Sequence, residues 1–195
     1  MTRSIWISAV LAMGFASSLA QKTTEPPVSK VPISSELLGI YRDFLEFYSH
    51  SRSRVSKAAL NVSQTTSSFS PDDMDRGGCL KGFEAENPRM LVLHTLSSVA
   101  FPKSAVRLVD PATHKVRDPE EWMQRGEDAD RAVSAGLAAG LFTFSEIVFD
   151  ASHAHAAFSY SFHCGRLCGD GGVTIYEKKN GKWKPSETSC ARFVS

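Results

Sequence analysis

The stretch of sequence that decides the fold reads LFTFSEIVFDASHAHAAFSYSFHCGRLCGDGGVTIYEKKNGKWKPSETSCARFVS, residues 141–195. Its clearest element is the run 156–164, in which Ala, Phe, Tyr, Phe and Cys occupy every second position and Ala, Ser, Ser and His lie between them. A period of two with aromatic residues on one face is typical of a half-buried β-strand. The pattern therefore predicts a strand over 156–164.

Three more β-rich runs flank this strand. Residues 142–149 precede it, and the polar residues 150–153 form a plausible turn between the two. Residues 173–178 follow, and Asn180-Gly181 then gives the strongest short hairpin signal, because both positions of a type I′ turn need a positive φ. A last strand is expected over 183–194. Short connections favour pairing of consecutive antiparallel strands, so these runs predict a four-stranded meander.

Helical signals lie earlier in the chain. Ser34 or Ser35 can cap a helix whose apolar residues fall on one face, namely Leu37, Tyr41, Phe44, Leu45 and Tyr48. A second helix is expected to begin at Asp118-Pro119, a capping residue followed by a proline at the first helical position. The sequence thus predicts an α+β fold class, with N-terminal helices packed on a C-terminal antiparallel β-meander in a single domain over residues 34–195.

Residues 1–20 have the three parts of a signal peptide. Arg3 supplies the positive start, residues 5–15 are apolar, and Ser18-Leu19-Ala20 is a small-residue cleavage site. The apolar run is shorter than the roughly 20 residues that span a membrane. Residues 21–33 are polar and rich in proline, as expected of a flexible leader. We therefore expect an exported protein, periplasmic or extracellular, with no membrane span.

The charge balance narrows the choice of partners. Removal of Arg3 with the signal peptide leaves 21 of the 22 basic residues, which equals the 21 acidic ones. Nucleic-acid-binding domains usually carry a basic excess or a basic patch, and no basic cluster interleaved with aromatic residues occurs here. We expect no nucleic acid as a partner. A protein or a small-molecule ligand remains open.

Four cysteines in an exported chain indicate disulfides. Three pairings are possible. We favour Cys164–Cys168 with Cys79–Cys190, because Cys164 and Cys168 share one tight turn. We interpret the glycines in and after that turn as residues that allow its backbone conformation, because glycine adopts a positive φ without a steric penalty. They are Gly165, Gly169, Gly171 and Gly172. A phosphate-binding loop is the alternative, but such a loop needs a helix behind it and a strand is expected here.

The C-terminal motifs resemble those of a family of uncharacterised exported bacterial proteins. The shared features are a tryptophan-bearing segment, a Cys-Gly-x-Leu-Cys-Gly-x-Gly hairpin, a Gly-x-Trp strand and a terminal serine. The matching residues are Trp122, Ser145, Phe149, Cys164, Gly165, Leu167, Cys168, Gly169, Gly171, Gly181, Trp183 and Ser195, and the segment from Leu80 through Phe83 to Asn87 is similar as well. The chain departs from the pattern between Gly126 and Ala139, and Phe193 stands where the family usually has tryptophan. The resemblance implies export and a paired Cys164–Cys168 turn, and it brings no activity or catalytic residue.

Several other patterns bear on metal binding, redox chemistry or nucleophilic catalysis. His153 and His155 could share a metal ion with a third ligand, whereas His163 is eight residues beyond His155 on the same predicted strand, too far to join them. Cys164 and Cys168 have a longer spacing than the usual Cys-x-x-Cys redox motif. No Gly-x-Ser-x-Gly motif is present.

We therefore predict no metal and no cofactor, and leave the catalytic residues unassigned. The leading hypothesis is a disulfide-stabilised binding or structural module, and the alternative is an enzyme, a hydrolase or a thiol redox protein, whose site combines distant residues. Asn61-Val62-Ser63 also matches a glycosylation sequon.

Overall fold

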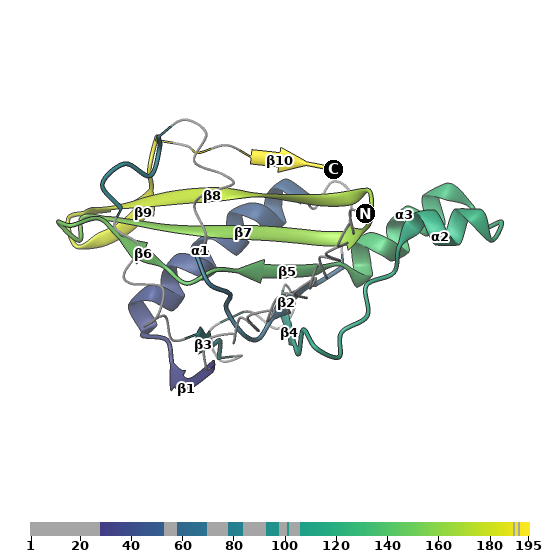
Figure 1. Cartoon of the computed structure of the whole chain (residues 1–195), viewed down its shortest axis with the longest axis horizontal. Coiled ribbons are helices and arrows are strands. Elements are labelled where there is room, and N and C mark those ends of the chain that lie inside the picture. The colour runs from purple at the N-terminus through teal and green to yellow at the C-terminus, as the bar shows by residue number, and fades with distance from the viewer. Residues whose placement is uncertain are drawn as a thin grey trace, which may run out of the picture.

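The computed structural model describes residues 28–52, 58–69, 78–83, 93–97, 101, 106–188, 190 and 192–195, so the expected signal peptide lies outside the described residues. The main feature is one curled mixed sheet with the strand order β10-β8-β7-β5-β2-β4, to which β6 adds on β7 and β9 on β8 (Figure 1). The strands of this sheet are β2 (Leu60–Ser63), β4 (Val106–Val109), β5 (Leu141–Phe144), β6 (Val148–Phe149), β7 (His155–Gly165), β8 (Cys168–Lys179), β9 (Lys182–Pro185) and β10 (Arg192–Val194). A separate parallel pair joins β1 (Val28–Pro32) to β3 (Leu93–Thr95). The helices are α1 (Ser35–Arg52), α2 (Pro119–Gln124) and α3 (Ala129–Ala139).

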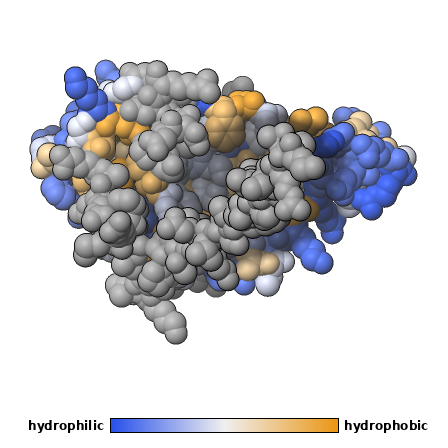
Figure 2. Space-filling view, viewed as in Figure 1, coloured by the Kyte–Doolittle hydropathy of each residue, from blue (hydrophilic) through white to orange (hydrophobic). Residues whose placement is uncertain are grey.

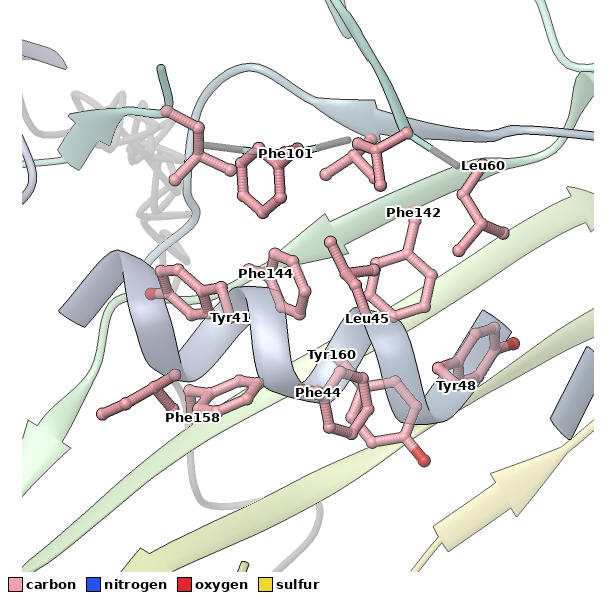
Figure 3. Packing of buried hydrophobic residues seen from close by; sticks show 14 of the residues in the cluster. Tyr41, Phe44, Leu45, Tyr48, Leu60, Phe101, Phe142, Phe144, Phe158 and Tyr160 are labelled. Atoms are coloured by element: carbon pink, nitrogen blue, oxygen red, sulfur yellow. The ribbon is translucent and has the colours of Figure 1, made fainter. Parts of the chain in front are cut away.

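The main core lies between α1 and one face of the sheet. Figure 3 shows Tyr41, Phe44, Leu45 and Tyr48 of α1 facing Phe142, Phe144, Phe158 and Tyr160 of β5 and β7. The Tyr41 ring stacks on Phe144 at a centroid distance of 4.5 Å and meets Phe158 edge-on at 5.0 Å. Aromatic pairs in these geometries add about 0.5–1.5 kcal/mol beyond the burial of their area. The helical apolar spacing and the period of two in β7 thus meet in one aromatic layer.

The predicted fold class is wrong in two respects. The sheet is mixed and is not an antiparallel meander, because the N-terminal strand β2 pairs in parallel with both β4 and β5. In the described residues α1 is the helix that covers a face of the sheet, and it is not part of a layer of helices: α2 and α3 precede β5 in the chain and lie beyond one end of the sheet, where Figure 2 shows a largely hydrophilic surface. The alternation of Leu60 and Val62 with Asn61 and Ser63 indicates a strand in this region, and β2 forms there. The alternation does not indicate which strands pair with β2, and its partners β4 and β5 are distant in the chain.

The predictions of individual strands agree more closely with the structure than the predicted sheet does. β7 pairs with β8 over nearly its whole length in the antiparallel sense, and β8 turns into β9 at Asn180-Gly181, where both residues have a positive φ. The expected strands 142–149 and 183–194 are each interrupted. The first divides into β5 and β6, and the second into β9 and β10.

The turn between β7 and β8 docks on the N-terminus of α2. Asp118 caps the helix by accepting a hydrogen bond from the Glu120 amide (3.0 Å), and it also accepts one from the Arg166 amide (3.0 Å). A Cβ atom on Gly165 would lie 2.8 Å from the Asp118 carboxylate, so only glycine permits this approach. Leu167 is 70% exposed and does not fill the inside of the turn, because the end of α2 supports the turn.

Candidate functional site

An open pocket of about 460 Å³ lies on the sheet face opposite α1. Its apolar base includes Ile175 of β8, which belongs to a second buried cluster, and Phe83. The residues around this base come from three segments: Cys79, Lys81 and Gly82; Asp150, Ala151, Ser152 and His155; and Ser186 and Thr188. Residues that are far apart in the described chain therefore converge at one place.

The Cys79–Cys190 disulfide connects two of these segments. Their Cα atoms are 5.4 Å apart, and the sequence separation is 111 residues. Cys79 itself lines the pocket, and Cys190 follows the lining residues Ser186 and Thr188. Phe83 anchors the first segment a second time, through an isolated antiparallel bridge to Asp150. The pocket is thus bounded by a covalently closed loop and not by regular strands alone.

Asp150 and His155 form the principal polar pair of the pocket. The His155 Nδ1 atom lies 3.1 Å from Asp150 Oδ2, and the His155 amide donates to Asp150 Oδ1 at 2.9 Å. The Ser152 hydroxyl donates to Asp150 Oδ2 at 2.6 Å. The turn between β6 and β7 therefore folds around the Asp150 carboxylate. The carboxylate holds the His155 ring by its Nδ1 atom, and Nε2 is the ring nitrogen that Asp150 does not contact.

These hydrogen bonds also control the protonation of Asp150. Burial alone would raise the pKa of this carboxyl group, but the hydrogen bonds from Ser152 and from the backbone and ring of His155 outweigh burial and hold the pKa well below its usual range. Asp150 is therefore ionised at neutral pH. An ionised carboxylate bonded to Nδ1 is the arrangement that orients a histidine for proton transfer or for ligand binding through Nε2.

The three histidines considered from the sequence are dispersed. His155 lines the pocket, whereas His153 has a φ of 53° and stacks its ring on Phe149 at a centroid distance of 5.2 Å. His163 lies at the far end of β7, paired with Gly169. Within the described residues, no group of three His, Cys, Asp or Glu side chains is placed to hold a metal ion.

Cys164 and Cys168 bond to each other across the end of the β7–β8 hairpin, with their Cα atoms 5.1 Å apart. Together with Cys79–Cys190, this is the pairing that the sequence favours. Cys164 is buried in the main core. The glycines that follow serve strand packing: a Cβ on Gly169 would lie 2.8 Å from the Phe162 carbonyl oxygen, and one on Gly171 would lie 2.5 Å from the Phe193 ring.

A second polar cluster, centred on Glu146, is not indicated by any pattern in the sequence. Glu146 is buried, and its carboxylate accepts hydrogen bonds from the Thr66 hydroxyl and from the His94 amide (2.8 Å). The His94 Nδ1 atom lies 2.9 Å from the second carboxylate oxygen. Beside the cluster, Tyr41 donates to the Ser145 carbonyl at 2.6 Å, and burial, reinforced by the charge of Glu146, raises the pKa of Tyr41. No local motif marks these residues, because three separate segments contribute them.

The sequon residue Asn61 has a structural role. It is 4% exposed in β2, and its side-chain amide donates to the carbonyl groups of Ala138 (2.9 Å) and Gly140 (3.1 Å). Both amide hydrogens are therefore engaged in holding the C-terminal end of α3. A glycan on this nitrogen is incompatible with the folded state.

The helices in the described part of the chain are all too short or too polar to cross a membrane. Comparison with known proteins adds no relative: the chain matches no protein-family model, no curated protein and no solved structure. The geometry of the pocket is therefore the basis for a functional assignment.

Proposed function

We propose that this chain is an exported, disulfide-stabilised binding module and that the pocket beside the Cys79–Cys190 disulfide is its ligand site. The observation that carries the proposal is the pocket itself. Its volume of about 460 Å³ is within the usual range for small-molecule sites, about 300–1,000 Å³, and it combines an apolar base with a few polar groups. The disulfide holds two of its sides together, so little chain entropy needs to be lost when a ligand binds.

The arrangement of the polar groups favours binding over covalent catalysis. A serine nucleophile needs its hydroxyl beside the base that removes its proton. Here the Ser152 hydroxyl donates to Asp150, and the Asp150 carboxylate also holds the His155 ring. Ser152 and His155 therefore share an acceptor and do not form a nucleophile–base pair.

A fragment screen with amide-resolved NMR tests the binding function. Ligands of the pocket should shift the amide signals of Lys81–Phe83, Ala151 and Ser186–Thr188. Ala151→Trp should abolish these shifts by filling the pocket, whereas the control Ala112→Trp, in an exposed turn elsewhere, should leave them unchanged. Fragments that bind but leave all pocket amides unshifted would refute the assignment.

Export is the second part of the proposal. Two disulfides are typical of oxidising compartments, and the signal-peptide pattern of residues 1–20 and the resemblance to exported bacterial proteins support the same location. Expression of the full chain in a bacterial host should give a mature protein that begins at Gln21 and has no free thiol. Retention of Met1 with four reactive thiols would contradict export.

A hydrolase is the second candidate, and the Asp150–His155 pair favours it. With Nδ1 held by the carboxylate, His155 Nε2 could act as general base on a water molecule in the pocket. His155→Gln should then abolish hydrolysis of a panel of ester and phosphoester substrates. Equal rates for His155→Gln and the unmodified protein would exclude this role.

A further inference from the structure

The polar groups of the pocket differ in how much hydrogen-bonding capacity they have left. Asp150 is the carboxylate of the lining, and its oxygens already accept from the Ser152 hydroxyl, the His155 amide and the His155 ring. A carboxylate has about four lone-pair sites, so three are occupied. Ser152 gives its hydroxyl hydrogen to Asp150, and its oxygen accepts from the Ala154 amide at 3.3 Å. The acidic corner of the pocket therefore has no donor left for a ligand and little acceptor capacity.

The remaining capacity belongs to groups that favour an oxyanion. Lys81 brings an ammonium group with three donors and no acceptor. Ser186 accepts from the Thr188 amide at 3.1 Å, which leaves its own hydroxyl hydrogen for a ligand, and Thr188 contributes a second hydroxyl. His155 also lines the pocket, and because its Nδ1 is held by Asp150, Nε2 is the ring nitrogen left for a ligand.

From this donor set we propose that the natural ligand of the pocket is a small organic carboxylate, with its anionic end toward Lys81 and His155 and its apolar body over Ile175 and Phe83. The proposal rests on the binding function above and specifies its ligand class. A monoanion fits better than a phosphate monoester, because among the described residues that line the pocket Lys81 is the one with a permanent positive charge. A phosphate carries about one and a half to two negative charges at pH 7 and commonly recruits several donors or a bidentate arginine.

The test uses three probes that share a phenyl group: 3-phenylpropionate, 3-phenylpropionamide and phenyl phosphate. Affinities are measured by NMR titration of the pocket amides with the full mature chain. The carboxylate should bind at least about fivefold more tightly than the amide, the factor expected for one partly exposed ion pair of about 1 kcal/mol. Phenyl phosphate should bind no more tightly than the carboxylate.

Two variants assign this preference to the pocket. Lys81→Gln should reduce the preference for carboxylate over amide to near unity with little effect on amide binding. The control Lys115→Gln, at an exposed lysine in another part of the fold, should leave the preference unchanged.

The possible results separate the ligand class from the binding function. Amide and carboxylate that shift the pocket signals equally would overturn the carboxylate assignment and leave the binding function intact. Tighter binding of phenyl phosphate, or a preference that survives Lys81→Gln, would also overturn it. Failure of all three probes overturns it as well, and if the fragment screen also gives no shifts at the pocket, the binding function fails with it.

Discussion

Removal of each disulfide should have very different effects on stability. Cys79–Cys190 closes a sequence separation of 111 residues, and Cys164–Cys168 closes one of 4. In the chain-entropy model, these loops correspond to about 5 and about 2 kcal/mol of stabilisation, respectively. Replacement by alanine avoids placing a hydroxyl group in the core, where Cys164 is 1% exposed, and the loss of that buried sulfur adds about 1 kcal/mol. We therefore expect losses of about 5 kcal/mol for Cys79→Ala/Cys190→Ala and about 3 kcal/mol for Cys164→Ala/Cys168→Ala.

Urea unfolding of the mature protein measures both losses, with fluorescence of Trp122 and Trp183 as the signal. Opening the long loop should also increase the denaturant dependence of the unfolding free energy, because the unfolded chain becomes more expanded. Opening the short loop should leave that slope unchanged. A loss for the Cys164/Cys168 variant equal to or greater than that for the Cys79/Cys190 variant would refute the reasoning from loop length.

Three further substitutions test individual contacts. Asp150→Asn should remove the stability that the ionised carboxylate contributes. Because folding lowers the pKa of Asp150, this contribution is present above the ordinary aspartate pKa of about 3.9 and is lost as the pH falls below that value. The melting temperatures of wild type and variant should therefore differ at neutral pH and converge in acid. Tyr41→Phe removes the buried 2.6 Å hydrogen bond to the Ser145 carbonyl and should cost about 1–2 kcal/mol in urea unfolding, whereas no change would show that the carbonyl finds another donor. Gly171→Ala places a Cβ 2.8 Å from a neighbouring carbonyl oxygen and should speed amide exchange in β10, while the control Gly39→Ala, with no atom within 4 Å of its Cβ, should stabilise α1 by about 1 kcal/mol.

Local patterns in the sequence were sufficient to predict several elements. Alternation identified β7, the Asn180-Gly181 pair identified the β8–β9 hairpin, and Asp118 identified the start of α2. Each of these signals is contained within a few neighbouring residues. Their physical cause is local as well: side-chain burial, turn conformation or helix capping.

Sheet order could not be predicted in the same way. Leu60 and Val62 alternate with Asn61 and Ser63, which indicates a strand, but nothing within β2 indicates that β4 and β5 are its neighbours. The predicted strand over 183–194 failed for a related reason. β9 pairs with residues 176–179 of β8 and β10 with residues 170–172, and Cys190, which lies between β9 and β10 in the chain, is bonded to Cys79 more than a hundred positions away.

The candidate site was only partly accessible from sequence. The sequence draws attention to His155 beside His153 but predicts no metal there, and the His153 ring lies against Phe149 and not with His155 in the pocket. The Asp150–Ser152–His155 spacing could have suggested a turn closed by a carboxylate. Lys81 and Thr188 reach the pocket only through the tertiary fold, so no short motif could have joined them to His155.

The position of the Cys79–Cys190 bond also determines how the protein would respond to a pulling force. A tension applied to the two ends of the chain cannot extend the segment between these cysteines, which would otherwise contribute about 370–400 Å of contour length. The force would act first on α1, β2 and β10, which lie outside the covalent loop. β2 would be sheared along its parallel partners, whereas β10 could be peeled from β8 one pair at a time. The bond therefore directs the first load to segments outside the covalent loop, which include α1 on one side of the main core, and it prevents extension of the segment that contains the β7–β8 hairpin.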